Sequence, residues 1–129
     1  MEIKGSRILV IGGAGLIGSH VVEELLNEDV KEVIVYDNFC RGTHENLEFA
    51  LRDPRCGIFV IGGDILQTDI LNAAMKGVDG VIHLAALWLL QCHEFPRAAL
   101  DANIHFFLAV LEACVKNNIK RLVYFSSAS

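Results

Sequence analysis

Three glycines and one carboxylate in the first 40 residues have the types and spacing to bind a phosphorylated ligand. Gly12, Gly15 and Gly18 follow the short apolar run Ile8–Ile11, and a helical pattern begins after them. Gly12 would allow a sharp turn, Gly15 a close approach of pyrophosphate to the backbone, and Gly18 tight packing of the helix. The N-terminus of that helix adds unpaired N–H donors and a partial positive charge, which favour an anion.

A carboxylate follows the next apolar run. Residues 32–36 form this run, and Asp37 comes directly after it, 19 residues beyond Gly18. A carboxylate at this position can accept hydrogen bonds from both hydroxyls of an adenosine ribose. Glycine-rich turns can also serve only as tight corners, but strand, glycine loop, helix, strand and acid occur here in the order typical of dinucleotide binding. Asp37 would repel the 2′-phosphate of NADP, which favours NAD, although Arg41 could pair with that phosphate.

Composition limits the protein to one globular domain. The chain has 129 residues, of which 53% are hydrophobic and 21% charged, and its net charge is -5. It has no basic surface signature of a nucleic-acid-binding protein. Its longest apolar run, residues 84–90, is too short to cross a bilayer, and its first residues contain no apolar signal segment. We therefore expect a cytoplasmic protein with no membrane partner, whose cysteines are reduced thiols without metal. These are Cys40, Cys56, Cys92 and Cys114.

Apolar runs alternate with helical patterns along the whole chain. Further strands are predicted at 57–61, 78–84 and 120–125, and helices at 65–76 and 98–116, with a short surface helix at 43–51. In the first helix, Ile17, Val21 and Leu25 recur at every fourth residue and predict the apolar face. This alternation predicts an α/β doubly wound parallel sheet, a Rossmann fold, with five strands in order 3-2-1-4-5 and helices on both faces. A ligand would lie across the carboxyl ends of strands one, two and four.

Three features admit two interpretations each. Asp64, after the third strand, could bracket an adenine ring with Ile65 or could cap the following turn. His83, at the end of the fourth strand, could act in catalysis, but a lone histidine there is more often structural. The 98–116 helix is apolar on more than one face, so it is either deeply buried or also packs against a second copy, which we favour.

The chain resembles the extended short-chain dehydrogenase/reductases, specifically the NAD-dependent nucleotide-sugar epimerases and dehydratases. Five segments carry the resemblance in the family's order and spacing, and they extend across the whole chain: residues 12–20, 36–39, 63–65, 83–86 and 121–129. The resemblance implies that the chain is the NAD-binding Rossmann part of such an enzyme. It also implies a nucleotide-sugar substrate in the full-length enzyme, with transient hydride transfer between a sugar carbinol and NAD. The resemblance does not distinguish an epimerase, for example one like UDP-glucose 4-epimerase, from a dehydratase.

The resemblance also implies roles for individual residues. The pyrophosphate would be held by Gly12, Gly15 and Gly18 with the neighbouring Leu16 and Ile17. Asp37 would bind the adenosine ribose with Asn38 near it. The remaining implied contacts are Asp64 and Ile65 at the adenine, Leu84, Ala85 and Ala86 toward the nicotinamide ribose, Asn103 in support of the active site, and Ser127 as the catalytic hydroxyl.

Two departures from the family pattern bear on function. The family has Gly-Thr shortly after the asparagine of the long helix, whereas this chain has Phe106-Phe107. The family's Tyr-x-x-x-Lys pair, in which Tyr is the base and Lys lowers its pKa, does not occur in these 129 residues. We therefore expect the chain alone to be inactive, and a dinucleotide-binding module without turnover is the alternative to an enzyme part. Self-association is expected through the 98–116 helix or through the unpaired edge of the fifth strand.

Overall fold

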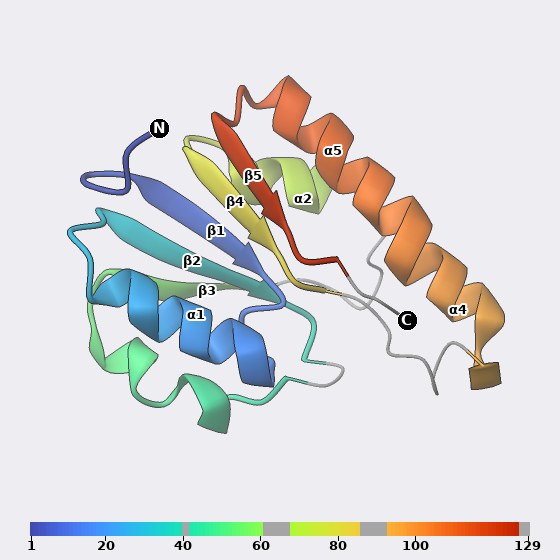
Figure 1. The fold of residues 1–129 in the computed structure, drawn as a ribbon, viewed down its shortest axis with the longest axis horizontal. Coiled ribbons are helices and arrows are strands. Elements are labelled where there is room, and N and C mark those ends of the chain that lie inside the picture. Colours follow the sequence, from blue (N-terminus) through green and yellow to red (C-terminus); the bar gives the residue numbers. More distant parts are fainter. Residues whose placement is uncertain (40–41, 61–67, 86–92, 127–129) are drawn as a thin grey trace.

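The computed structural model describes residues 1–39, 42–60, 68–85 and 93–126, and for Val60 the backbone alone. Five strands form one sheet in the order β3-β2-β1-β4-β5, and all four neighbouring pairs are parallel (Figure 1). The strands are β1 (Arg7–Ile11), β2 (Glu32–Asp37), β3 (Cys56–Val60), β4 (Gly80–His83) and β5 (Arg121–Tyr124). This confirms the predicted doubly wound fold and its strand order. Because the strands are parallel, their carboxyl ends meet at one edge of the sheet.

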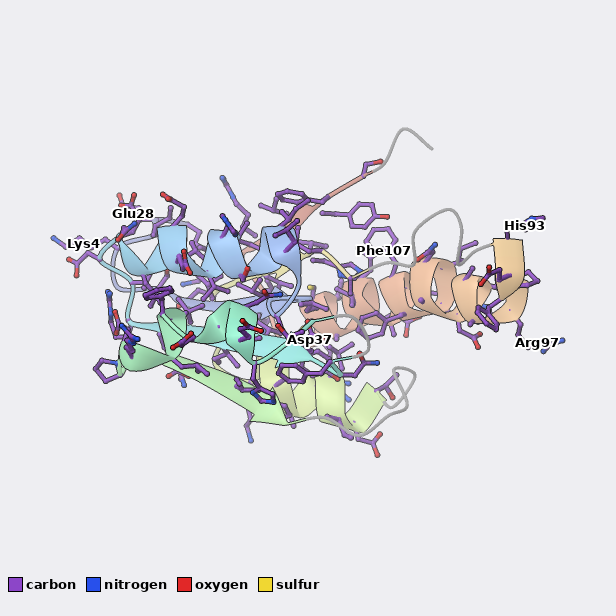
Figure 2. All side chains as sticks on the ribbon, turned by 90° about the horizontal axis from the view of Figure 1, so that it is seen from below. Lys4, Glu28, Asp37, His93, Arg97 and Phe107 are labelled. Atoms are coloured by element: carbon purple, nitrogen blue, oxygen red, sulfur yellow. The ribbon has the colours of Figure 1, made fainter. Side chains whose placement is uncertain are left out.

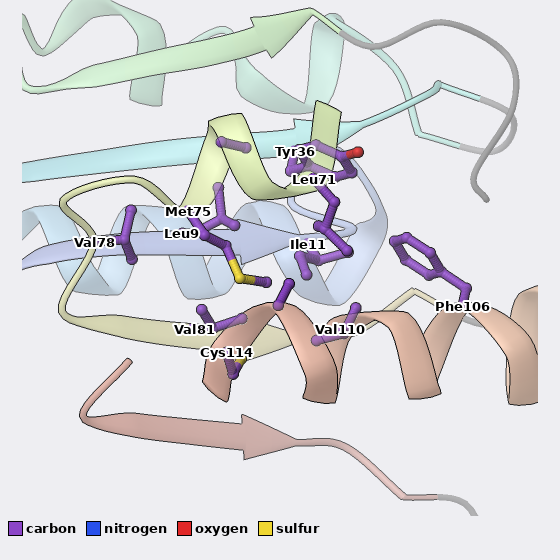
Figure 3. Packing of buried hydrophobic residues seen from close by; sticks show 12 residues of the cluster. Leu9, Ile11, Tyr36, Leu71, Met75, Val78, Val81, Phe106, Val110 and Cys114 are labelled. Atoms are coloured by element: carbon purple, nitrogen blue, oxygen red, sulfur yellow. The ribbon is translucent and has the colours of Figure 1, made fainter. Parts of the chain in front are cut away.

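Helices cover both faces of this sheet. Ile8 and Val10 of β1 pack with helix α1 (Leu16–Leu26) in one apolar cluster. Leu9 and Ile11 point to the opposite face, because successive side chains of a strand alternate. There they pack with α2 (Thr68–Met75) and α5 (Phe106–Lys116), as Figure 3 shows. The sheet therefore lies between two apolar cores, and β1 contributes to both.

The face that α1 turns to the sheet differs from the predicted one. Its buried residues are Gly18, Ser19, Val22 and Leu25, whereas the side chain of Ile17 is 61% exposed. Gly18 determines this orientation, since a Cβ on it would lie 2.1 Å from the carbonyl oxygen of Gly12. The helix can approach the loop this closely only along a surface without a side chain. Ile17 is therefore moved out of the core.

Residues 43–51 do not form the single surface helix that the sequence predicts. Two 3₁₀ helices take its place, η1 (Glu45–Leu47) and η2 (Ala50–Arg52). Leu47 and Ala50 are buried against the α1 side of the sheet, as expected, but Leu51 is exposed. Short 3₁₀ turns are common where tertiary contacts, rather than helix propensity, hold a connecting segment.

The long helix begins with α4 (Pro96–Leu100), in which Pro96 stands in the first turn as predicted. A π-helical segment, η3 (Asp101–His105), joins it to α5, and Figure 1 shows one continuous rod. The helix ends at the predicted place, since Asn118 adopts the left-handed conformation (φ 55°). The N–H of Asn118 donates to Val115 and that of Ile119 to Cys114, which together form a Schellman motif.

This helix is not deeply buried, so that interpretation of its apolar character is wrong. Phe106, Val110, Ala113 and Cys114 are buried, but large apolar side chains on the outer side stand in solvent. The rod of 21 residues, Pro96–Lys116, is also long and apolar enough to cross a membrane by length and composition alone. One face of α5 nevertheless contributes to the core of the sheet, which is how a helix of a globular domain packs.

The substitution of Phe106-Phe107 for smaller residues has a structural consequence at the end of the sheet. The ring of Phe106 meets the ring of His83 edge-on at 5.6 Å, and the ring of Phe107 stacks on Tyr124 at 4.2 Å. The two phenylalanines thus fill the space between α5 and the ends of β4 and β5. Larger side chains on the helix are matched by aromatic partners on the strands.

Candidate functional site

The glycine loop leaves the carboxyl end of β1 in a tight turn. Gly12 has φ 83°, its N–H donates to the Tyr36 carbonyl at 2.8 Å, and a Cβ on it would lie 3.0 Å from the Ala85 nitrogen. Both its conformation and the approach of the chain after β4 therefore require glycine. At Gly15, a Cβ would find its nearest atom, the Gly12 carbonyl oxygen, at 3.4 Å, an ordinary contact. The protein itself thus leaves room at Gly15 for a ligand atom.

The N-terminus of α1 supplies hydrogen-bond donors at this loop. Gly15 is the N-cap, and the N–H of Ser19 makes the first bond of the helix, to Gly15, at 2.9 Å. The N–H groups of Leu16, Ile17 and Gly18 precede that bond and have no acceptor within the helix. No acidic side chain lies in this first turn. The partial positive charge of the helix end is therefore available to an anion such as a phosphate.

Asp37 lies across this loop and is held by it. Its Oδ2 accepts the N–H of Ala14 at 3.0 Å, and its Oδ1 accepts the N–H of Phe39 at 2.7 Å. Each carboxylate oxygen can accept a further hydrogen bond, so the side chain can still bind hydroxyl groups. These two bonds fix the carboxylate in position before any ligand arrives. Figure 2 shows Asp37 at the end of β2, and Asn38 beside it is exposed.

The segment after β2 folds back onto the glycine loop, a contact that the sequence patterns did not predict. The N–H of Thr43 and the side-chain Nδ2 of Asn46 both donate to the carbonyl of Ala14, at 3.1 and 2.9 Å. The rings of Phe39 and His44 stack nearby, with centroids 4.2 Å apart and planes within 9°. Ala14 is therefore held from both sides, by Asp37 at its N–H and by Asn46 at its carbonyl. No local spacing rule links Asn46 to Ala14, 32 residues away.

Two further predicted residues lie beside the loop. Leu84 continues from β4 and donates its N–H to the Ile11 carbonyl at 2.9 Å, and Ala85 is the residue that approaches Gly12. The carboxyl ends of β1, β2 and β4 thus meet around the glycine loop, as predicted. Asn103 lies in η3, where its side chain is half-buried. Asp64, Ile65, Ala86 and Ser127, together with Arg41, fall outside the described residues, so their predicted roles stay predictions.

His83, the last residue of β4, lies inside the protein. Its side chain is 1% exposed and is surrounded by the rings of Phe106, Phe107 and Tyr124. Its Nδ1 has no hydrogen-bond partner among the described residues. Burial lowers the pKa of His83 to about 4, so the ring is neutral at physiological pH. This environment favours the structural interpretation of His83 over a catalytic one.

In the described part of the chain, neither Tyr36 nor the cysteines supply an acid–base pair at the carboxyl ends of the strands. Burial raises the pKa of Tyr36 to about 12, and its ring stacks on Phe59. Cys56 and Cys114 are free thiols, and Cys40 and Cys92 lie outside the described residues. Within residues 1–39, 42–60, 68–85 and 93–126 no three His, Cys, Asp or Glu side chains cluster as a metal site. The chemistry available here is the binding of a phosphorylated, hydroxyl-bearing ligand.

Comparison with known proteins relates this geometry to a family. The family model for NAD-dependent epimerases and dehydratases matches residues 8–129. The bifunctional protein GAL10 of Candida maltosa is 35% identical over 127 residues, which cover 94% of this chain and 81% of that protein. UDP-glucose 4-epimerase of Pasteurella multocida is 35% identical over 125 residues, which cover 95% of this chain and 37% of that enzyme.

A solved structure agrees with these matches. UDP-glucose 4-epimerase from Stenotrophomonas maltophila, with bound NAD and formylated UDP-arabinopyranose, superposes with a TM-score of 0.83 at 30% identity. The superposition covers 95% of this chain and 37% of the epimerase. This chain thus spans little more than a third of the length of these two epimerases. Its match to the family model covers nearly all of its residues, and the chain therefore belongs to the NAD-dependent epimerase/dehydratase family.

Proposed function

We propose that this chain binds NAD across the carboxyl ends of β1, β2 and β4. The observation that carries the proposal is the arrangement at Ala14. The N–H groups of Leu16, Ile17 and Gly18, which have no acceptor within the helix, follow Ala14 closely in the chain, and the Asp37 carboxylate accepts the N–H of Ala14 itself. A dinucleotide joins a pyrophosphate to a ribose diol, and these are the groups that such donors and such a carboxylate bind.

Each part of the cofactor has proposed partners. The backbone of residues 12–18 would hold the pyrophosphate, with Gly15 leaving space for it. Asp37 would accept the ribose hydroxyls, with Asn38 adjacent, and Leu84 and Ala85 would line the path to the nicotinamide ribose. Asp64 and Ile65 are proposed for the adenine, Ala86 for the nicotinamide side, and Asn103 and Ser127 for the active site. NAD, when bound, would supply the hydride acceptor for a sugar hydroxyl.

NAD is proposed over NADP because of charge. The Asp37 carboxylate, fixed by Ala14 and Phe39, cannot turn away from a 2′-phosphate without losing two hydrogen bonds. The two negative charges would repel each other at close range. Replacement of Asp37 should therefore weaken NAD binding and also reduce the preference for NAD over NADP.

Calorimetric titration of the chain with NAD and with NADP tests this proposal. Asp37→Ala should weaken NAD binding by about tenfold or more, because it removes charge-assisted hydrogen bonds to the ribose. Asp29→Ala is the matched control, since the Asp29 carbonyl bonds to Gly5 at the opposite end of the sheet. Binding of NAD that is equal in wild type and Asp37→Ala would contradict the assigned site. Absence of binding by either dinucleotide would contradict the proposed function itself.

For the full-length protein we propose a nucleotide-sugar epimerase or dehydratase. The 129 residues hold Tyr36 and Tyr124, but Cys40 and Ala128 stand where a Lys four residues on would be needed. Burial also raises the pKa of Tyr36, which opposes its use as a base. The second candidate function, a dinucleotide-binding module without turnover, rests on this observation. NAD-dependent epimerisation of a nucleotide sugar by these 129 residues would contradict the predicted inactivity.

Location and assembly remain proposals. We expect the protein in the cytoplasm, and we expect it to self-associate through the long helix or through the free edge of β5. β5 pairs with β4 on one side only within the described sheet.

A further inference from the structure

The carbonyl oxygen of Ala14 is the point at which residues 42–46 contact the glycine loop. It accepts the N–H of Thr43 at 3.1 Å and the side-chain Nδ2–H of Asn46 at 2.9 Å. A carbonyl oxygen has two lone pairs, so these two donors use its full capacity. On the preceding peptide, the N–H of Ala14 donates to the Asp37 carboxylate at 3.0 Å. Both peptide planes at Ala14 are therefore fixed by residues from outside the loop.

The peptide that carries this carbonyl leads directly into helix α1. Its nitrogen belongs to Gly15, the N-cap of α1, and the N–H of Gly15 donates to the Gly12 carbonyl at 3.2 Å. Because a peptide unit is planar, a fixed carbonyl oxygen also fixes the N–H on the opposite side. Rotation of this peptide would change the direction of the first turn, whose N–H groups have no acceptor within the helix. Asn46 thus contributes to the orientation of the donors at the start of α1.

Asn46 is itself held in place by its own segment. Its backbone N–H donates to Thr43 Oγ1 at 3.2 Å, and the next residue, Leu47, is fully buried in the apolar cluster that includes α1. Gly42 lies against the loop, because a Cβ on it would be only 2.6 Å from the Cβ of Ala14. Leu47 therefore attaches the segment to the fold, whereas the Asn46 amide connects it to the loop.

We propose that Asn46 is a positioning residue for the pyrophosphate of the cofactor, an inference that rests on the NAD binding proposed above. Asn46 acts through the Ala14–Gly15 peptide, and not by contact with the ligand. By holding this peptide, it orients the N–H groups at the start of α1 before the ligand arrives, so less ordering is needed on binding. Asp37 is proposed for the ribose, so the two side chains that hold Ala14 serve different parts of one ligand.

Calorimetric titration with NAD tests this role in two Asn46 variants and a control. Asn46→Ala removes one hydrogen bond to the loop, and we expect it to weaken NAD binding about fivefold, the equivalent of one net hydrogen bond. Asn46→Asp keeps the side-chain volume but presents an oxygen to the Ala14 carbonyl, so it should weaken binding further. Asn72→Ala is the matched control, because Asn72 Nδ2 donates to the Thr68 carbonyl at 2.8 Å in α2. The control should bind NAD as wild type does.

A comparison of ligands separates positioning from a general loss of structure. ADP contains the two phosphates, whereas adenosine has the ribose without them. Asn46→Ala should weaken ADP binding by the same factor as NAD binding, but should change adenosine binding, followed by NMR titration, by less than about twofold. Asp37→Ala should weaken the binding of all three ligands. Urea unfolding of each variant checks that the fold is retained, and Asn46→Asp decides the question if Asn46→Ala does not fold.

Three outcomes would overturn the proposal. NAD binding that is equal in wild type and both Asn46 variants would do so while leaving the proposed NAD site intact. Equal losses for NAD, ADP and adenosine in Asn46→Ala would show that Asn46 supports the fold of the site as a whole. If the wild type binds neither NAD nor ADP, the proposed function fails, and the positioning role fails with it.

Discussion

His83 should make the stability of this protein depend on pH. The imidazole is 1% exposed among three aromatic rings, and its pKa falls from an ordinary 6.5 to about 4 because burial disfavours the charged form. The unfolded chain therefore binds a proton at this site at higher pH than the folded one does. Stability from His83 is fully present above pH 6.5 and is lost as the pH falls from 6.5 toward 4.

The size of the effect follows from that difference in pKa. With about 1.4 kcal/mol per pH unit, the full loss below pH 4 is about 3 kcal/mol, and the loss between pH 7.5 and pH 5 is about 2 kcal/mol. The lower pKa of Asp53, about 2, results mainly from hydrogen bonds with Arg55. The Asp53 carboxylate titrates below pH 5, so it should not affect the change in stability between pH 7.5 and pH 5 that is assigned to His83.

Urea unfolding of wild type and His83→Phe at pH 5 and 7.5 measures this contribution. Phenylalanine suits the aromatic surroundings and cannot be protonated, so the variant should lack about 2 kcal/mol of the acid-induced loss. His93→Phe, at an exposed histidine, should behave like wild type. Equal losses of stability in wild type and His83→Phe would show that His83 is solvated or charged in the folded protein. The inferred burial of a neutral ring would then be wrong.

Further predictions concern the glycine loop, the core and the end of the long helix. Gly15→Ala should retain the wild-type unfolding midpoint but lose dinucleotide affinity by calorimetry, whereas Gly18→Ala should be strongly destabilised, because its Cβ would lie 2.1 Å from a carbonyl oxygen. Leu9→Ala, at a side chain with no exposure, should cost about 2–5 kcal/mol in urea unfolding. Leu108→Ala, at a half-exposed position, should change the free energy of unfolding by less than about 0.5 kcal/mol. Asn118→Ala should lower stability, since φ is 55° there and alanine is disfavoured in this conformation, whereas Asn118→Gly should retain the helix end because glycine adopts it without strain.

The fold was predictable because its determinants are local in the sequence. Short apolar runs bounded by glycine and polar residues correspond to the five strands, and two helix ends were marked by Pro96 and Asn118. Strand order followed from the glycine fingerprint in the first unit, since right-handed crossovers leave few ways to arrange the remaining strands. The loop, the helix N-terminus and Asp37 came together because they all lie at carboxyl ends of neighbouring strands.

What the sequence did not predict depends on contacts between distant residues. The orientation of α1 follows from the absence of a side chain at Gly18. The sequence prediction chose the buried face of the helix from the spacing of its large apolar residues, so it did not take this glycine into account. The 3₁₀ segments after β2 follow from the bonds of Thr43 and Asn46 to Ala14, which compete with a regular helix. In both cases the glycine loop imposes the deviation. The two segments that deviate from the sequence-based prediction, α1 and the 3₁₀ segments after β2, are therefore those that shape the proposed cofactor site. Functional sites are where the conformation of a protein is expected to differ most from local sequence preference.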